Sequence, residues 1–167
     1  FDEPIQDRSD QTPLPHIVGG MTFEHLSFRY EPEQDDVLSD IHFDVQPGEV
    51  VAFVGHSGAG KTSLIQLIMR FYDPTKGRIL VDGHPLSTVK LSDLRSHMAI
   101  VAQEDVIFRG TLIENLRFGK LDATEDEVIK AAEMANAWEF IREFPSHLYT
   151  KVGDRGHRLS GGQKQRI

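Results

Sequence analysis

The sequence predicts an α/β fold in which an apolar strand, a glycine-rich loop and an amphipathic helix follow one another directly. The strand is expected at Val50–Val54, a continuous apolar run whose length suits a buried strand. The loop is GHSGAGKT, Gly55–Thr62, which fits the pattern G-x-x-x-x-G-K-S/T. From Lys61 onward, apolar residues recur three and four positions apart, as on one face of a helix. Together these observations predict a loop that holds a phosphate group at the start of a helix.

The segments before the loop predict a linker and a small sheet. Asp2–Pro15 is acidic, contains proline and shows no periodicity, so we interpret it as a linker rather than a packed element. Residues that favour β-structure dominate Met21–Tyr30 and Val37–Val45. A turn at Pro47–Glu49 separates the second run from the apolar strand. We therefore expect a small sheet that leads into the buried strand.

The segments after the loop predict first a mixed and then a helical region. The helix that begins at Lys61 should continue to Tyr72 and end at Asp73-Pro74. The other expected elements are a strand at Arg78–Val81, a turn at Asp82-Gly83, a helix near Leu91–Ser96, a strand at Met98–Ala102, and helices at Leu112–Phe118, Glu125–Ala135 and Ala137–Phe144. Strand signals become rare after Glu104, so the last third is expected to form a separate helical lobe.

Composition excludes several classes of protein. The chain has 167 residues, of which 39% are hydrophobic and 26% charged, as in an ordinary globular domain. No apolar run approaches the ~20 residues of a membrane span, and residues 1–20 lack the layout of a signal peptide. The absence of cysteine excludes disulfides, and the eight histidines show no zinc-ligand spacing. The net charge is -8, with most of the acidity in residues 1–44, and no basic stripe indicates a nucleic-acid partner.

The chemistry expected of the glycine-rich loop follows from its residue types. Glycines allow backbone N–H groups to point toward a phosphate, and the helix start adds partial positive charge. Lys61 would reach the terminal phosphates, and the Thr62 hydroxyl would bind Mg²⁺. The predicted nucleotide contacts are Gly55, His56, Ser57, Gly58, Ala59, Gly60, Lys61, Thr62 and Ser63. Asp82 is interpreted as a β-turn residue rather than a magnesium ligand, because only three apolar residues precede it and Gly83 follows it.

A second glycine-rich turn lies in RLSGGQKQRI, Arg158–Ile167. Ser160 and Gln163 have the spacing of a capping box, so Ser160 is expected to begin a short helix. Gly161 and Gly162 each cost about 1 kcal/mol of helix stability relative to alanine, which suggests the close approach of another backbone or an anion. A capped helix start with two bare glycines is therefore a second predicted anion site.

LSGGQ at Leu159–Gln163, placed after the phosphate loop, resembles the signature of ATP-binding-cassette (ABC) ATPase domains. The resemblance extends over Met21–Ile167. It implies a P-loop NTPase fold with an antiparallel β-subdomain, a RecA-like parallel-sheet core that is incomplete here, and a helical subdomain. It also implies ATP and Mg²⁺ as ligands, with Tyr30 stacking on adenine and Gln103 touching Mg²⁺ and the attacking water. The ATP held by a second domain in a head-to-tail pair would be contacted by Ser160, Gly161, Gly162 and Gln163.

Two further segments are similar to the exporter branch of this family, in which one chain joins a membrane domain to the ATPase domain. They are FRGTLIENLRFG, Phe108–Gly119, and VGDRG just before LSGGQ. The resemblance implies a linker from a membrane domain at 1–20, a β-subdomain with the P-loop core at 21–103, and a Q-loop with the helical subdomain at 104–167. It implies a place on the cytoplasmic face of a membrane. The expected partners are the transmembrane domain of an exporter and a second ABC ATPase domain, with no nucleic acid.

The sequence departs from the family in two places. Lys151 stands where exporters usually carry a glutamate ahead of the signature. The Walker B aspartate, catalytic glutamate and switch histidine of the family belong downstream of Ile167, so we expect this portion to bind ATP without the groups for hydrolysis. Glu104 is not expected to replace the glutamate, since the family leaves that position non-catalytic. Without a downstream strand, Val50–Val54 should present an exposed apolar edge.

The sequence is compatible with three functions. The first is the ATPase domain of an exporter, the second an ABC-type ATPase of chromosome maintenance or repair, and the third a non-catalytic module that binds a nucleotide or a partner domain. The exporter-like segment Phe108–Gly119 and the lack of a basic stripe favour the first. The transported substrate is expected to be selected by membrane helices rather than by this domain.

Overall fold

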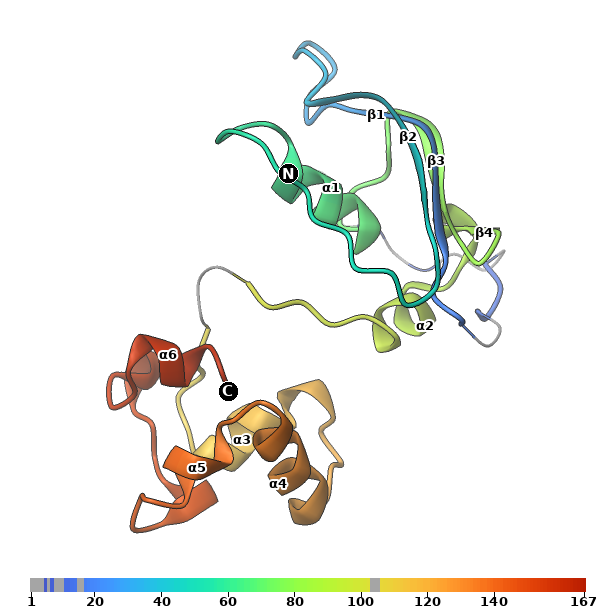
Figure 1. Ribbon diagram of the computed structural model, residues 1–167. Helices are drawn as coiled ribbons and strands as arrows, with labels where there is room; N and C mark the ends of the chain where they lie inside the picture. The colour runs from blue at the N-terminus through green and yellow to red at the C-terminus, as the bar shows by residue number, and fades with distance from the viewer. Residues whose placement is uncertain (1–4, 6, 8–10, 15–16, 103–105) are drawn as a thin grey trace. The chain divides into compact units, whose positions relative to one another are not determined.

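The computed structural model of the chain describes residues 5, 7, 11–14, 17–102 and 106–167. It consists of two compact units, residues 1–99 and residues 100–167 (Figure 1). The first unit is built around a sheet and the second around short helices. The second unit begins at residue 100, whereas the sequence predicts a helical lobe from residue 104.

A four-stranded antiparallel sheet forms the frame of the first unit. Its strands are β1 (Met21–Phe28), β2 (Leu38–Val45), β3 (Lys76–Val81) and β4 (His84–Pro85), in the spatial order β2-β1-β3-β4 (Figure 1). Phe23 of β1 lies opposite Phe43 of β2 and Ile79 of β3, and the rings of Phe23 and Phe43 stack with their centroids 4.2 Å apart. Such cross-strand pairs stabilise a sheet, so the small sheet predicted from β-favouring residues is confirmed.

Two α-helices pack into the apolar core of the first unit. They are α1 (Lys61–Ile68) and α2 (Leu91–Ser96). Leu64 and Leu67 of α1 and Leu94 of α2 are buried in one cluster with the apolar residues of the sheet. Burial of a leucine side chain contributes about 1.5–3 kcal/mol, so this packing fixes α1 against the sheet.

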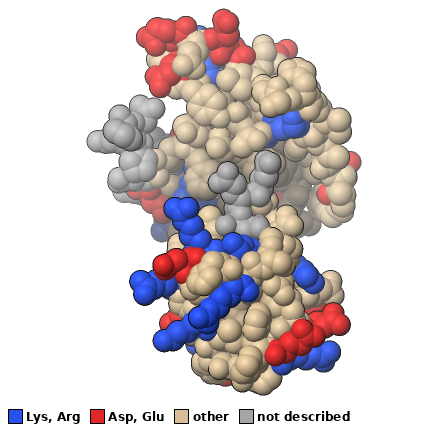
Figure 2. Space-filling view, turned by 90° about the vertical axis from the view of Figure 1, so that its left-hand side faces the viewer, with Lys and Arg blue, Asp and Glu red and all other residues tan. Residues whose placement is uncertain are grey.

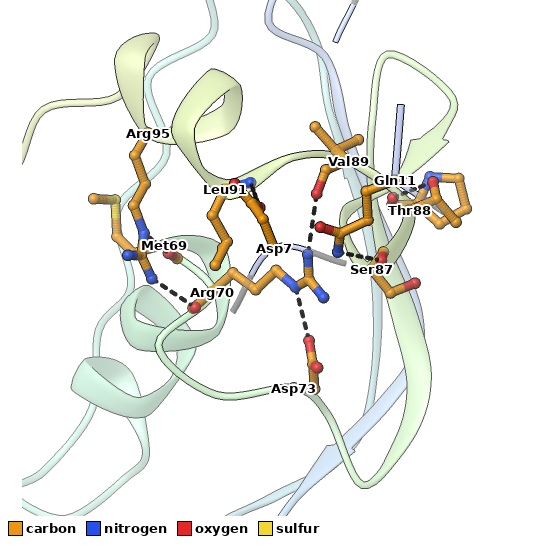
Figure 3. A network of polar contacts seen from close by, with 11 residues as sticks. Asp7, Gln11, Met69, Arg70, Asp73, Ser87, Thr88, Val89, Leu91 and Arg95 are labelled. Carbon is orange, nitrogen blue, oxygen red and sulfur yellow. Dashed lines mark hydrogen bonds and ion pairs between the residues drawn. The ribbon is translucent and has the colours of Figure 1, made fainter. Parts of the chain in front are cut away.

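The helix α1 ends before the predicted Tyr72, because Arg70 takes a left-handed conformation with φ of 51°. Arg95 of α2 donates to the carbonyl oxygens of Met69 and Arg70, at 3.1 and 2.9 Å (Figure 3). Carbonyl groups at the end of a helix need such partners. The buried Arg70 side chain in turn pairs with Asp73 at 3.0 Å. The end of α1 is therefore fixed by long-range contacts that helical periodicity does not reveal.

Two predicted strands, Val50–Val54 and Met98–Ala102, are not strands in the structure. Neither pairs with a strand among the described residues. Val50 and Val54 are 96% and 93% exposed, and Val101 is 78% exposed. The prediction of a buried strand is wrong, because an apolar run forms a strand only where a neighbour completes its hydrogen bonds. The side chains of Val50 and Val54 are exposed as expected, but they lie on a segment that is not a strand, and the described residues form no parallel sheet.

Asp7 and Thr12, two of the described residues before the sheet, contact the first unit, so at these two positions the interpretation of residues 2–15 as a linker without packing is wrong. Thr12 N–H donates to the Thr88 carbonyl oxygen at 3.0 Å, and the Thr12 carbonyl oxygen accepts from Lys90 N–H at 3.2 Å. Asp7 Oδ1 accepts from the N–H of Leu91, the first residue of α2, at 2.6 Å (Figure 3). Asp7 and Leu91 are 84 residues apart in sequence, so local composition could not predict their contact.

Asp82 lies in the turn between β3 and β4, in agreement with its predicted role. Its carboxylate accepts from the N–H groups of Val18 at 2.7 Å, Gly19 at 3.1 Å and Gly20 at 2.7 Å. Gly19 first, and then Val18 and Gly20, hold the pKa of Asp82 below its ordinary value through these backbone bonds. Asp82 therefore fixes the chain as it enters β1.

Short helices around one apolar core form the second unit. They are α3 (Leu112–Leu116), α4 (Glu125–Met134), α5 (Trp138–Ile141) and α6 (Gly161–Lys164) (Figure 1). The core of this unit contains Leu112, Ile141 and Leu148. Capping boxes begin α3, α4 and α6, and each satisfies backbone donors that a helix start leaves open. Local sequence thus specifies where these helices begin.

Acidic side chains gather at one end of the first unit (Figure 2). The loop between β1 and β2 carries four of them, Glu31, Glu33, Asp35 and Asp36. Arg29 pairs with Asp36 at 2.8 Å. The acidity that the sequence places in residues 1–44 is thus partly a feature of one exposed loop rather than of the site around α1.

Candidate nucleotide-binding site

The loop Gly55–Gly60 leads directly into α1 and turns through two glycines. Gly58 and Gly60 have φ values of 82° and 81°, which residues with a side chain rarely adopt. A Cβ atom on Gly60 would lie 2.6 Å from Leu38 Cδ2 and 3.0 Å from the Val37 carbonyl oxygen. Glycine at position 60 is therefore required both by the turn and by the close approach of the loop to the start of β2.

Lys61 folds back over this loop. Its Nζ donates to the carbonyl oxygens of Gly55 at 2.8 Å and His56 at 2.7 Å. The loop carbonyls thus hold the ammonium group beside the loop. Phosphate oxygens carry more negative charge than carbonyl oxygens and form stronger hydrogen bonds with an ammonium group. A bound phosphate would therefore displace the carbonyls as partners of Lys61.

The first turn of α1 leaves three backbone donors open. Within the described residues, the N–H groups of Lys61, Thr62 and Ser63 donate no hydrogen bond, and Gly60 supplies no side-chain cap. Open N–H groups and the partial positive charge of a helix start together bind anions. The first turn of α1 therefore has the donors that a phosphate group needs.

Thr62 is the residue of this turn that could contact a metal ion. Its side chain is exposed at the start of α1. In the part of the chain that the structure describes, no three His, Cys, Asp or Glu side chains gather in a way that could hold a metal. A Mg²⁺ ion here would depend on phosphate oxygens, water and few protein oxygens, which is the usual arrangement for Mg²⁺ bound with a nucleotide. Gln103, the other predicted metal contact, lies outside the described residues, as does Glu104.

Tyr30 lies beside α1, where the sequence places a base-stacking residue. Its hydroxyl group is 2.8 Å from Ser63 Oγ and donates to Gln66 Oε1 at 2.9 Å. Tyr30 is 38% exposed, and its ring meets the Phe28 and Tyr72 rings nearly at right angles. The structure thus joins Tyr30 to the helix that carries Lys61. Sequence reasoning missed Gln66 and Tyr72, although the i, i+3 spacing of Ser63 and Gln66 on one helix face was an available signal.

The LSGGQ segment forms the predicted capping box in the second unit. Ser160 N–H donates to Gln163 Oε1 at 2.9 Å, and Gln163 N–H donates to Ser160 Oγ at 3.3 Å. Gly161 and Gly162 are exposed, and a Cβ atom on either would meet no described atom within 4 Å. Packing within the described chain does not explain these glycines, which leaves their surface open to another molecule. The phosphate loop and Tyr30 belong to the first unit, so the predicted site residues are divided between two units.

Comparison with known proteins agrees with these observations. The model of the ABC transporter family matches residues 38–167. The chain is 45% identical over its whole length to the ATP-dependent lipid A-core flippase of Chromobacterium violaceum, of which it covers 29%. A solved structure of a bacterial Atm1-family ABC exporter with ATP bound is similar to 98% of this chain, with a TM-score of 0.89 and 38% identity. The chain covers 29% of that exporter as well, so it spans less than a third of both relatives.

Among the described residues, no helix is long and apolar enough to cross a membrane. The family match begins at β2 and continues through the phosphate loop to the LSGGQ turn, so it includes both predicted ligand-binding segments. The antiparallel sheet, the loop before α1 and the helical unit are parts of an ABC-type P-loop NTPase fold. The chain belongs to the ABC transporter family.

Proposed function

We propose that this chain is the ATP-binding part of an exporter's ATPase domain and that it binds ATP with Mg²⁺ at Gly55–Ser63. The observation that carries the proposal is the set of three open N–H donors at the start of α1, with Lys61 held beside them by two carbonyl oxygens. A triphosphate satisfies these donors and exchanges its oxygens for the carbonyls that Lys61 contacts. The phosphates are thereby bound by the backbone and by one mobile cation.

Magnesium and the base complete the proposed ligand. When bound, Mg²⁺ neutralises charge on the phosphate oxygens, and Thr62 and Gln103 are the residues that would hold it. The half-exposed ring of Tyr30 stacks on adenine. Support for this role comes from its hydrogen bonds to Ser63 and Gln66, which place the ring beside the phosphate-binding helix.

A second ATPase domain is the proposed partner of the LSGGQ turn. In a head-to-tail pair, Ser160, Gly161 and Gly162 contact the phosphates of the ATP held by the other domain. The open surface over the two glycines supports this contact, because no atom of the described chain occupies the space where their side chains would lie. Binding of ATP then joins the two domains.

A transmembrane partner is proposed from the relatives and from one exposed aromatic pair. The flippase and the exporter to which the chain is similar are transporters by name. In the second unit, the rings of Phe108 and Phe118 stack with centroids 4.6 Å apart, and the two residues are 48% and 65% exposed. Exposed aromatic pairs are typical of contact surfaces. In our proposal this pair contacts the cytoplasmic side of the membrane domain, and ATP hydrolysis and transport are activities of the intact protein.

The experiment that tests this function separates ATP binding from domain pairing. In the intact protein, Ser160→Arg places bulk on the LSGGQ surface, whereas Ser146→Arg makes the same change at another exposed serine of the same unit. ATP affinity and ATP-dependent association are measured in parallel by calorimetry and sedimentation. We expect Ser160→Arg to abolish association and leave ATP affinity near that of the wild type, and Ser146→Arg to change neither. A collapse of ATP affinity in Ser160→Arg would contradict the head-to-tail arrangement.

A further inference from the structure

The hydroxyl group of Tyr30 is held by two side chains from one face of α1. Ser63 Oγ lies 2.8 Å from it, and Gln66 Oε1 accepts its proton at 2.9 Å. A phenol has one proton to donate. Because that proton is directed to Gln66, Ser63 must be the donor in the other bond. The hydroxyl group of Ser63 therefore donates to Tyr30, and the hydroxyl group of Tyr30 donates to Gln66.

The ring of Tyr30 is also fixed in orientation. Tyr72 meets it edge-on, with centroids 5.3 Å apart and an interplanar angle of 89°. Phe28 meets it at 4.8 Å and 77°. Perpendicular aromatic contacts of this kind are favourable. The helix that supplies Ser63 and Gln66 is itself anchored by the buried Leu64 and Leu67, so the ring is held relative to a fixed element.

Ser63 and Gln66 differ in how near they lie to the open backbone donors at the start of α1. Ser63 belongs to the first turn of α1, and its backbone N–H is one of the three open donors that face an incoming phosphate. If its hydroxyl group turns to the phosphate, Tyr30 loses that partner. Gln66 lies one turn further along the helix, away from the open donors. It is therefore the partner that can keep the Tyr30 hydroxyl in place in the nucleotide complex.

We propose that Gln66 is a positioning residue that, through the Tyr30 hydroxyl, fixes the stacking ring relative to the phosphate loop and so sets the affinity for the adenine base. The inference rests on the proposed function and deepens it. Gln66 acts on the base and not on the phosphates. Its loss should therefore weaken ATP while leaving a ligand without a base unaffected.

The test compares ATP with inorganic triphosphate, titrated by calorimetry into the intact protein with Mg²⁺ present. Gln66→Leu removes the acceptor at nearly constant size, and Tyr30→Phe removes the donor and keeps the ring. Each should weaken ATP about fivefold, the usual effect of one hydrogen bond, and leave triphosphate unchanged. The double variant should lose no more than either single variant, because both remove the same bond. Gln66→Glu keeps an acceptor, so its ratio of ATP to triphosphate affinity should return toward the wild-type value.

Tyr149→Phe is the matched control, since the Tyr149 hydroxyl donates to Glu125 in the second unit. It should leave both affinities unchanged. The positioning role would be overturned if Gln66→Leu kept the wild-type ratio of ATP to triphosphate affinity. It would also be overturned if the losses of ATP affinity in the two single variants multiplied in the double variant. In both cases the proposed function stands. Equal losses for both ligands would show that Gln66 only supports the fold. Failure of the wild-type protein to bind either ligand would overturn the proposed function itself.

Discussion

Substitution of Asp82 tests the structure directly, because a structural role and a magnesium-binding role of this residue predict opposite effects on stability and on Mg²⁺-dependent ATP binding. As the residue after an apolar run it could be mistaken for a magnesium ligand, whereas the structure uses its carboxylate to accept from the N–H groups of Val18, Gly19 and Gly20. Asp82→Asn keeps the size and removes the charge and one acceptor oxygen. We expect a less stable first unit and an unchanged Mg²⁺ dependence of ATP binding.

The size of the loss follows from the three bonds. A hydrogen bond to a charged group contributes about 1.5–3 kcal/mol when protected from water. The bonds from Val18 and Gly19 are exposed and that from Gly20 is partly buried. In the variant, hydrogen bonds to water therefore offset most of the energy lost with the first two bonds. We therefore expect the free energy of unfolding to fall by roughly 2 kcal/mol. Circular dichroism during urea unfolding is the suitable assay, because the single tryptophan, Trp138, lies in the other unit.

The direction of the pKa shift of Asp82 determines how its contribution to stability changes with pH. The pKa of Asp82 is lowered in the folded state by its backbone bonds, so its stabilisation is fully present above the unfolded value of about 3.9 and is lost as pH falls through the folded pKa. The difference between wild type and Asp82→Asn should shrink as the pH falls below 4. Asp44→Asn, at an exposed carboxylate on β2, is the control. Loss of Mg²⁺-dependent ATP binding with unchanged stability would refute this reasoning.

Three further predictions concern the base, the exposed edge and the N-terminal segment. Tyr30→Ala should weaken ATP by about tenfold and inorganic triphosphate hardly at all, since stacking contacts only the base; equal losses in calorimetry would make Tyr30 merely structural. The double variant Val50→Thr/Val54→Thr should slow the aggregation of the isolated 167-residue chain, because these two valine side chains are almost fully exposed. Light scattering measures the aggregation rate, and an unchanged rate would show that aggregation involves another surface. Asp7→Ala should speed hydrogen exchange of the Leu91 amide about fivefold through loss of its acceptor, and unchanged exchange would show that the contact is not formed in solution.

The features that sequence predicted correctly are those with local causes. The capping box at Ser160–Gln163 depends on four consecutive residues, and the turns at Gly58 and Gly60 depend on glycine itself. The strand Val50–Val54 was predicted wrongly, because its ladder requires a partner that an apolar run does not encode. The links from Tyr30 to α1 could not be predicted either, since Tyr30 and Ser63 are 33 residues apart and meet only after β1 and α1 pack together.

The central claim is that the loop before α1 binds ATP through its phosphates. The most direct measurement is the ATP affinity of Lys61→Ala in the intact protein, determined by calorimetry beside Lys76→Ala, which removes an exposed lysine from β3. Lys61 is the cation held beside the loop by the Gly55 and His56 carbonyl oxygens. Removing its bonds to phosphate should weaken ATP by about a hundredfold, while Lys76→Ala retains wild-type affinity. Wild-type ATP affinity in Lys61→Ala would contradict the account.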